Sequence, residues 1–267
     1  MSLSVGVIGC GNMGSALARG MVEAHLLAAG RIVGYDADSS KARKLARNLK
    51  IRTGRSAAEA AACSVVLLAV KPQQMAELLQ EIKPYLKHRP LLISVAAGIR
   101  SGWIERRVGR GVPVVRVMPN TPALIRKGIS AVVTGASAGP NHRALAERIL
   151  RSVGEVVPLE EKQMDAVTAI SGSGPAYFFY LIEQLANAGV SLGLKPETAR
   201  RLALATAQGA AELAAGSGED PALLRAKVTS KGGTTEAAFK VFKKRGLDKV
   251  LREGIRAAAR RAKELSG

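Results

Sequence analysis

Three glycines near the start of the sequence have the spacing of a phosphate-binding turn. The apolar run Val5–Ile8 has the length of a strand, and Gly9, Gly11 and Gly14 follow it in the pattern G-x-G-x-x-G. In such a turn the first glycine permits the bend, the second lets a pyrophosphate approach the backbone, and the third lets the next helix lie close to the strand. The free N–H groups and the dipole at the start of that helix attract phosphate oxygens. Glycines also mark ordinary turns, so the surroundings decide what the pattern means.

The surroundings of these glycines are those of a dinucleotide site. Apolar residues recur at helical spacing over 16–22, and a second strand-like run, Ile32–Tyr35, ends at Asp36. Asp36 follows Gly14 by 22 residues, close to where an acidic residue hydrogen-bonds the ribose hydroxyls of a dinucleotide. The predicted cofactor-binding residues in this part of the chain are Gly9, Gly11, Asn12, Met13, Gly14 and Asp36.

A second cluster of groups suited to anion binding lies between residues 229 and 236. Gly232, Gly233, Thr234 and Thr235 stand directly before a helical pattern. Their backbone N–H groups and hydroxyls can surround a small carboxylate. The same residues also fit a plain helix start, in which Thr234 or Thr235 caps the helix and Glu236 complements its dipole. The residues alone leave both interpretations open.

Alternating strand and helix patterns position the first cluster at the edge of a sheet. Short apolar runs recur between helical segments as far as residue 159, which is typical of a parallel sheet covered on both faces. After the second strand, we expect strands at 65–70, 91–95, 114–117, 129–134 and 155–159, with a helix that begins at Pro72. Met118–Pro122 follows one of these strands, at the end where ligands of such sheets bind. Alternatively, this segment is only a loop braced by its two prolines.

Beyond residue 162 no strand-like run appears, and helical patterns follow one another. We therefore predict an α/β protein, with an N-terminal Rossmann dinucleotide-binding domain at 1–162 and an all-α C-terminal domain at 163–267. The expected helices of the second domain lie at 172–184, 196–215, before 228, 236–244 and 247–265. No linker rich in proline or serine separates the two domains.

Composition and charge limit the kinds of molecule that the protein can be expected to bind. The chain of 267 residues has a net charge of +19, but its lysines and arginines are spread along helix faces and only 3% of its residues are aromatic. Proteins that bind single-stranded nucleic acid interleave basic and aromatic residues. We therefore expect no nucleic-acid partner, and we interpret the charge as a basic surface that attracts anionic ligands.

The cysteines and the hydropathy pattern indicate a compartment. Cys10 and Cys63 have neither the spacing of metal ligands nor an evident disulfide partner, which predicts a reduced, cytoplasmic protein without a metal site. No apolar run approaches about 18 residues, and no charged segment precedes the first strand, so we expect neither a membrane span nor a secretory signal.

Taken together, the sequence resembles the pyrroline-5-carboxylate reductases over essentially its full length. The motifs that carry the resemblance are Gly9–Gly14, Ala69–Pro72, Met118–Pro122, Ser171–Tyr177 and Thr229–Thr235. The last two are specific to the family, whereas the first is widespread. The resemblance implies a Rossmann domain followed by a helical domain that interlocks with its twofold mate. It also implies NAD(P)H-dependent reduction of 1-pyrroline-5-carboxylate to L-proline, the last step of proline biosynthesis.

The resemblance further implies roles for individual residues. Thr235 falls where the family has the hydroxyl that faces the ring nitrogen of the substrate, which makes it the catalytic residue. The residues that match the family's substrate-carboxylate loop are Ser230, Gly232, Gly233, Thr234 and Thr235. Those that fall near the nicotinamide half of the cofactor are Val70, Lys71, Pro72 and Asn120.

One position departs from the family pattern, which usually reads S-P-G-G-T-T in this loop. Lys231 stands in place of the proline. This change frees the backbone at 231 and adds a cation beside the predicted carboxylate site. Either tighter anion binding or a changed substrate would follow.

Three different functions compete with reduction of 1-pyrroline-5-carboxylate. The β-hydroxyacid dehydrogenases share the fold type and use a lysine early in the first interdomain helix, but residues 175–179 contain no lysine. Reducing a carbonyl needs a proton donor or a cation near the oxygen. A protonated imine already carries the positive charge that hydride transfer removes, so a neutral hydroxyl such as that of Thr235 can suffice. A reductase of another small cyclic imine, or a dinucleotide-binding regulatory protein without turnover, would fit the same motifs.

Cofactor choice and assembly complete these expectations. Asp36 can accept hydrogen bonds from a ribose diol but repels a 2′-phosphate, whereas Ser39, Ser40, Lys41 and Arg43 are close enough to assist NADPH. We therefore expect NADP(H) and NAD(H) both to be used.

Small and apolar residues over 173–190 and 196–215 suit close helix packing between chains. With the resemblance, they predict an obligate dimer or an assembly built from dimers.

Overall fold

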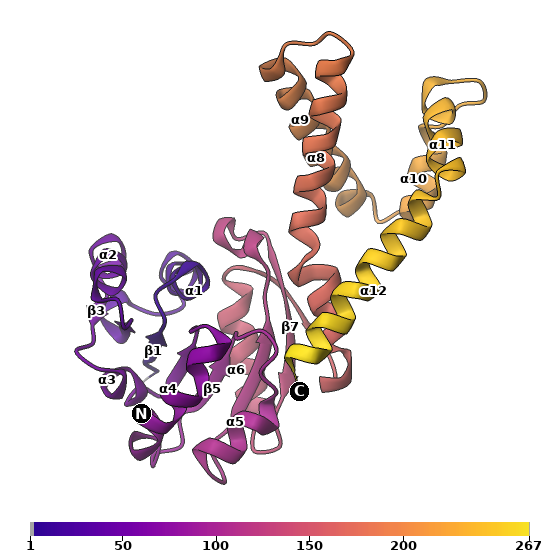
Figure 1. Ribbon diagram of the computed structural model, residues 1–267. Coiled ribbons are helices and arrows are strands. Elements are labelled where there is room, and N and C mark those ends of the chain that lie inside the picture. The colour runs from indigo at the N-terminus through magenta and orange to yellow at the C-terminus, as the bar shows by residue number, and fades with distance from the viewer. Residues whose placement is uncertain (1–2, 267) are drawn as a thin grey trace. The chain divides into compact units, whose positions relative to one another are not determined.

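The computed structural model describes residues 3–266 and forms two compact units (Figure 1). Unit 1 runs to Ser173 and includes the segment that begins at Ala258, and unit 2 comprises Gly174–Ala257. Among the described residues, no helix is long and apolar enough to cross a membrane.

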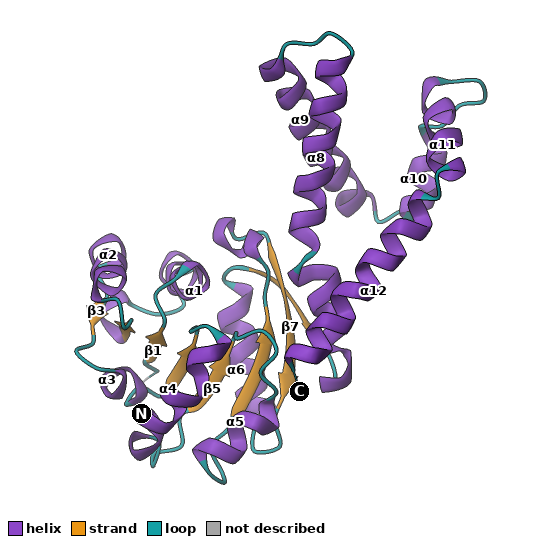
Figure 2. Cartoon of the chain, viewed as in Figure 1, coloured by secondary structure: helices purple, strands orange, loops and turns teal. Residues whose placement is uncertain are grey.

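Unit 1 contains an eight-stranded sheet with helices on both faces (Figure 2). The strand order is β3-β2-β1-β4-β5-β6-β7-β8, so the chain leaves β1 in one direction and later returns to its other side at β4. Such a switch point leaves a crevice at the carboxyl ends of the strands. The strands are β1 Val5–Ile8, β2 Ile32–Tyr35, β3 Arg52–Thr53, β4 Val65–Leu68, β5 Leu91–Ser94, β6 Val114–Met118, β7 Gly128–Thr134 and β8 Gly154–Pro158.

The predicted parallel sheet is correct for the expected strands as far as β6 and wrong for β7, and the short strand β3 was not predicted. β1 to β6 pair in parallel, whereas β7 runs antiparallel to β6, with Met118 opposite Ala131. The physical reason is the connection between them. A 3-10 turn at Thr121–Ile125 replaces a crossover helix, and a short connection can only return the chain antiparallel.

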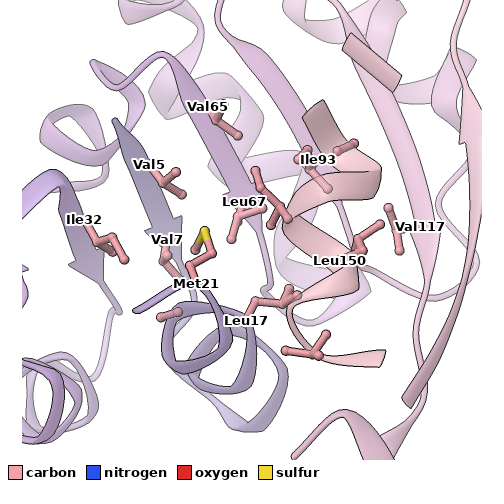
Figure 3. Close-up of a cluster of buried hydrophobic side chains, with 14 of the residues drawn as sticks. Val5, Val7, Leu17, Met21, Ile32, Val65, Leu67, Ile93, Val117 and Leu150 are labelled. Atoms are coloured by element: carbon pink, nitrogen blue, oxygen red, sulfur yellow. The ribbon is translucent and has the colours of Figure 1, made fainter. Parts of the chain in front are cut away.

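Alternate strand residues supply two separate cores. Val5 and Val7 belong to the cluster that packs against α1 and α6, whereas Ile8 belongs to the cluster on the opposite face. This alternation follows from the period of two along a strand. Figure 3 shows Leu17 and Met21 of α1 directed at the strands. The helices of unit 1 are α1 Asn12–Glu23, α2 Ser39–Leu49, α3 Ala57–Ala61, α4 Met75–Ile82, α5 Ser101–Val108, α6 Pro140–Arg151 and α7 Met164–Val167, the last followed by a π-helical turn at Thr168–Gly172.

An ion pair with a buried arginine ties β6 to the segment after β8. Arg116 in β6 is the one charged side chain that is buried among residues 3–266, and its guanidinium donates to the Glu161 carboxylate. The Ser101 hydroxyl, at the start of α5, donates to the other oxygen of Glu161 at 2.7 Å. β6, α5 and the segment before α7 are therefore joined by one polar network.

Unit 2 is made of helices whose apolar side chains are largely exposed. Within its described residues only Gly174, Ala199 and Ala203 are buried, whereas Phe178 and Phe179 are each about two thirds exposed. α8 and α9 pack against each other through small residues, such as Gly189 against Ala199. The helices are α8 Gly174–Ser191, α9 Pro196–Ser217, α10 Pro221–Lys227, α11 Thr234–Lys244 and most of α12 Leu247–Leu265.

The compact units differ from the predicted domain ranges 1–162 and 163–267, which stay a prediction. The last strand ends at Pro158, as the sequence pattern indicates, but α7 and the π-helical turn remain with unit 1. The end of α12 also lies in unit 1. The Ser266 hydroxyl donates to Asp165 at 3.2 Å, and a Cβ added at Gly98 would come within 2.8 Å of the Leu265 carbonyl oxygen.

Candidate active site

The glycines of the first turn are required for two different reasons. Gly9 has a φ of 99°, and a Cβ at this position would lie 2.5 Å from the Ala69 carbonyl oxygen. A Cβ at Gly14 would lie 1.9 Å from the Gly9 carbonyl oxygen. Around Gly11, the N-cap of α1, an added Cβ would meet nothing within 4 Å. Gly9 and Gly14 are therefore fixed by the protein's own packing, whereas Gly11 borders open space.

The Asp36 carboxylate joins two loops at this edge of the sheet. Its Oδ2 accepts a hydrogen bond from the Cys10 N–H at 2.7 Å, and its Oδ1 accepts one from the Asp38 N–H at 2.9 Å. The first contact holds the turn after β1, and the second holds the turn after β2. This bridge was not predicted, because nothing in the sequence says that the two turns touch.

Cys10 lies inside the glycine turn as a neutral thiol. Burial, with a smaller contribution from the negative charge of Asp36, raises its pKa from 9.0 to about 12. The thiol donates to the Tyr35 carbonyl oxygen at 3.5 Å, and the Cys10 carbonyl oxygen accepts from the Ser15 hydroxyl at 2.9 Å. Because the thiolate is the reactive form, this cysteine is not a nucleophile at neutral pH.

The other predicted cofactor residues of unit 1 follow β4 and β6. The register pairs Ile8 with Leu68, Leu68 with Ser94 and Ser94 with Arg116, so the carboxyl ends of β1, β4 and β6 share one edge of the sheet. Val70 packs against the core, and Lys71 is exposed.

Two details of these loops were not expected. Pro72 does not begin an α-helix. It begins a 3-10 turn, Pro72–Gln74, that leads into α4. The Asn120 side-chain oxygen accepts from the Ile129 N–H at 3.0 Å and so ties the loop after β6 to the start of β7.

This edge of unit 1 has the groups that a bound dinucleotide needs. The first N–H groups of α1, from Asn12 and Met13 onward, have no acceptor within the helix. Gly11 leaves room for a pyrophosphate beside them, and the half-buried Asp36 retains lone pairs for a ribose diol. Unit 1 therefore fits NAD(H) or NADP(H) on its own geometry. Among residues 3–266, no three His, Cys, Asp or Glu side chains cluster as metal ligands.

The turn of unit 2 at residues 229–235 has a geometry that the sequence did not indicate. Gly233 is the N-cap of α11, with no side-chain cap, so the alternative interpretation in which Thr234 or Thr235 caps this helix is wrong. These threonines are the first two helical residues instead. Glycine at the N-cap lets the turn close, since the Gly233 N–H donates to the Ser230 carbonyl oxygen at 3.0 Å.

Glu236 occupies part of the predicted anion nest. Its carboxylate accepts from the Gly232 N–H at 2.9 Å and also pairs with Lys240 at 3.2 Å. The Thr235 hydroxyl is half-buried and has no hydrogen-bond partner within the described chain. The donors left in this turn include the first N–H groups of α11 and the side chains of Ser230, Lys231, Thr234 and Thr235.

Sequence reasoning missed Asp38, and it gave Glu236 only the role of complementing the helix dipole, whereas both carboxylates organise their turns. The signal for Asp38 was present, since an aspartate directly before a helical pattern is a common N-cap. Its side chain accepts from the Ser40 N–H at 3.0 Å.

The fold and the glycine turn define a dinucleotide-binding protein of the Rossmann type, and comparisons with known proteins make the class specific. Residues 4–98 match the family model "NADP oxidoreductase coenzyme F420-dependent", and residues 161–265 match "Pyrroline-5-carboxylate reductase dimerisation". The chain belongs to the pyrroline-5-carboxylate reductase family. The predicted family, fold class and NAD(P)H cofactor are confirmed, and the matched dimerisation region indicates an oligomer.

Individual relatives support this assignment over nearly the whole chain. A pyrroline-5-carboxylate reductase from Pseudomonas aeruginosa is 44% identical over 264 residues, which is 98% of this chain and 96% of the relative. The solved structure of a pyrroline-5-carboxylate reductase from Coxiella burnetii is 36% identical, with a TM-score of 0.93 and 100% of both chains covered. The Plasmodium falciparum enzyme with NADP bound is 32% identical, with a TM-score of 0.89 and coverage of 100% of this chain and 99% of its own.

Proposed function

We propose that this protein reduces 1-pyrroline-5-carboxylate to L-proline with NAD(P)H. The observation that carries this proposal is the 44% identity to the Pseudomonas aeruginosa reductase along almost the entire length of both chains. The resemblance therefore includes both the glycine turn of unit 1 and the turn of unit 2, rather than a shared Rossmann domain alone.

The chemistry of this reaction suits the side chains of the two turns. The bound nicotinamide supplies a hydride to the carbon of the C=N bond, and the protonated nitrogen keeps its proton and becomes the amine of proline. The positive charge of the imine is neutralised in this step, so no acid has to donate a proton to a developing anion. The hydroxyl of Thr235 is suited to accept a hydrogen bond from the ring N–H, because it has no partner in the described chain.

The proposed site residues have separate tasks. The glycine turn and the start of α1 bind the pyrophosphate, Asp36 binds the adenosine ribose, and the residues from Val70 to Pro72 together with Asn120 border the nicotinamide half. The turn of unit 2 binds the substrate carboxylate. Because Glu236 and Ser230 already accept the N–H groups of Gly232 and Gly233, we assign that carboxylate to the N–H groups of Thr234 and Thr235 and the neighbouring side chains.

Other parts of the proposal concern assembly and location. The unpartnered apolar helices of unit 2 and the dimerisation match support a dimer, or an assembly of dimers, as the working form. The two free, buried cysteines support a reducing, cytoplasmic environment.

A substitution at Thr235 tests the assignment of the catalytic hydroxyl. Thr235→Val keeps the shape of the side chain, so kcat/KM for 1-pyrroline-5-carboxylate should fall about ten- to over a hundredfold, as a lost hydrogen bond of about 1.5–3 kcal/mol to a charged group predicts. The matched control is Thr198→Val, which changes an exposed threonine in the first turn of α9. If Thr235→Val retains the kcat/KM of the control and of the wild type, the turn is only a helix start.

A second experiment tests the substrate. The enzyme and its Lys231→Pro variant should be assayed with 1-pyrroline-5-carboxylate, with other cyclic imines and with ketones derived from 3-hydroxyacids. We expect 1-pyrroline-5-carboxylate to give the highest kcat/KM in both, with a lower KM when Lys231 is present, because its cation attracts the carboxylate. A preference for a ketone would support the β-hydroxyacid alternative, although α8 contains no lysine.

A further inference from the structure

The segment that follows β2 is organised by one exposed carboxylate, that of Asp38. Its Oδ1 accepts from both the N–H and the hydroxyl of Ser40, at 3.0 and 2.5 Å, and its Oδ2 pairs with the Lys41 ammonium at 3.7 Å. Its own N–H donates to Asp36 at 2.9 Å. Asp38 is therefore fixed beside Asp36 and holds the first polar side chains of α2.

These contacts bear on the choice of cofactor, because NADPH differs from NADH by a 2′-phosphate on the ribose that Asp36 is proposed to bind. In a Rossmann fold the acidic residue after the second strand binds the ribose diol, and a 2′-phosphate needs cationic or hydroxyl donors nearby. In this chain the nearby donors are Ser39, Ser40, Lys41 and Arg43. Two of the four are engaged with Asp38, and so is the Ser40 N–H at the start of α2.

The local charge acts in the same direction. The hydrogen bonds from Ser40 lower the pKa of Asp38, with a smaller contribution from Lys41, so this carboxylate stays ionised at neutral pH. Two negative side chains then stand where a 2′-phosphate would add about two more negative charges. Arg43 makes none of these contacts, so it can still offset part of the repulsion.

We propose that Asp38 is a specificity-determining residue, which favours NADH over NADPH by withholding Ser40 and Lys41 from a 2′-phosphate and by repelling it. This inference rests on the cofactor site proposed above. It narrows the expected use of both cofactors to a preference for NADH.

The test is a comparison of cofactor affinities with a matched control. Dissociation constants for NADH and NADPH are measured by fluorescence titration without an imine substrate, and kcat/KM is measured for both cofactors. Asp38→Asn keeps an oxygen that can cap α2 but removes the charge. Asp220→Asn makes the same change at the N-cap of α10, where Asp220 accepts from the Ala222 N–H at 2.7 Å.

We expect Asp38→Asn to move the ratio of the two dissociation constants toward NADPH by about fivefold or more, the size of one unit charge near contact in water. Asp220→Asn should leave the ratio unchanged. Ser40→Ala should have no effect on NADPH affinity in the wild type, but should weaken NADPH binding in the Asp38→Asn background. An unchanged ratio in Asp38→Asn, or a weaker NADPH affinity in Ser40→Ala alone, overturns the inference.

An Asp36→Ala variant separates this inference from the proposed cofactor site. If Asp36→Ala weakens NADH binding while Asp38→Asn leaves the ratio unchanged, the ribose site stands and only the role of Asp38 is wrong. If Asp36→Ala leaves both affinities unchanged, the ribose site is misassigned and the inference falls with it.

Discussion

Units 1 and 2 differ in where their apolar side chains lie. In unit 1, strand residues such as Val66 and Leu67 are completely buried between helices. In unit 2, helical residues of the same chemistry, such as Leu204 and Phe178, are more than half exposed. Contiguous exposed apolar surface is rare in monomeric proteins. Unit 1 thus completes its own core, whereas the apolar side chains of unit 2 stay exposed in the described chain, which together with the matched dimerisation region indicates an oligomer.

Units 1 and 2 also show that an apolar sequence pattern does not always mean burial within the chain. The apolar residues of α8 and α9 recur as they would in buried helices, but within one chain only Ala199 and Ala203 of α9 become buried. The matched dimerisation region, residues 161–265, includes both helices. In unit 2 the apolar pattern therefore does not report burial within the described chain, and the dimerisation match indicates an oligomer as its cause.

The largest effect should come from a charge on the exposed apolar surface of unit 2. Phe179→Glu should dissociate the oligomer and abolish activity, because a buried aromatic side chain contributes about 1.5–3 kcal/mol and each change occurs twice in a twofold interface. Light scattering and kcat/KM measure both consequences. Tyr85→Glu, an equally drastic change at an exposed aromatic of unit 1, should leave assembly intact. A monomeric wild type with full activity at micromolar concentration would remove the contrast between the units.

A somewhat smaller effect is expected in unit 1, where the core is complete. Glu161→Ala leaves the buried guanidinium of Arg116 without its partner, which should lower the free energy of unfolding by about 3–5 kcal/mol. Chemical denaturation measures the loss. Glu264→Ala removes an exposed partner of Arg261 and should cost at most about 1 kcal/mol. A similar loss in both variants would show that the buried network does not stabilise unit 1.

Gly209 tests whether a second chain packs against α9, and the expected change in stability is about 1 kcal/mol. An added Cβ there meets nothing within 4 Å of the same chain, so Gly209→Ala should stabilise an isolated helix by about 0.5–1 kcal/mol. If the second chain packs against α9 at this position, the methyl group should instead destabilise the dimer. Thermal unfolding at several protein concentrations distinguishes the two results. The corresponding change in unit 1, Gly6→Ala, places a Cβ 1.9 Å from the Ala60 carbonyl oxygen and should destabilise at every concentration.

The last effect is absent at neutral pH and develops only at high pH. Because the folded pKa of Cys10 is raised from 9.0 to about 12, the folded state holds this proton more tightly than the unfolded state. The resulting stability is fully present below pH 9 and is lost as the pH rises toward 12. The free energy of unfolding of Cys10→Ala should therefore fall less than that of the wild type between about pH 8 and pH 11. Parallel curves would show that the buried thiol does not contribute.

The sequence allowed prediction of the parts of the fold whose cause is local. Gly9 needs a positive φ and Val65–Leu68 needs burial on both faces, and both requirements are visible in the residues themselves. The reversed direction of β7 was not predictable, because it depends on how the chain turns after Met118 rather than on the strand's own composition. The contact of Asp36 with the Cys10 N–H depends on two turns that are 26 positions apart.

The turn of unit 2 likewise has features that the sequence predicts and features that only the folded chain shows. The residues of the turn were predictable, but not which atoms remain available, because Glu236 can equally complement the helix dipole or accept the Gly232 N–H. Only the folded backbone shows that the second contact is made. It also shows that Gly233, rather than a threonine, is the N-cap of α11.

The contacts of Ser266 with Asp165 and of Leu265 with Gly98 have a consequence for the order of folding during synthesis. These closing residues of unit 1 leave the ribosome after every residue of unit 2. The apolar helices of unit 2 are thus made before unit 1 can be finished, and their exposed side chains make the nascent chain prone to aggregation during that interval. Closure of unit 1 brings together residues about a hundred or more positions apart, which slows folding because long loops must close first.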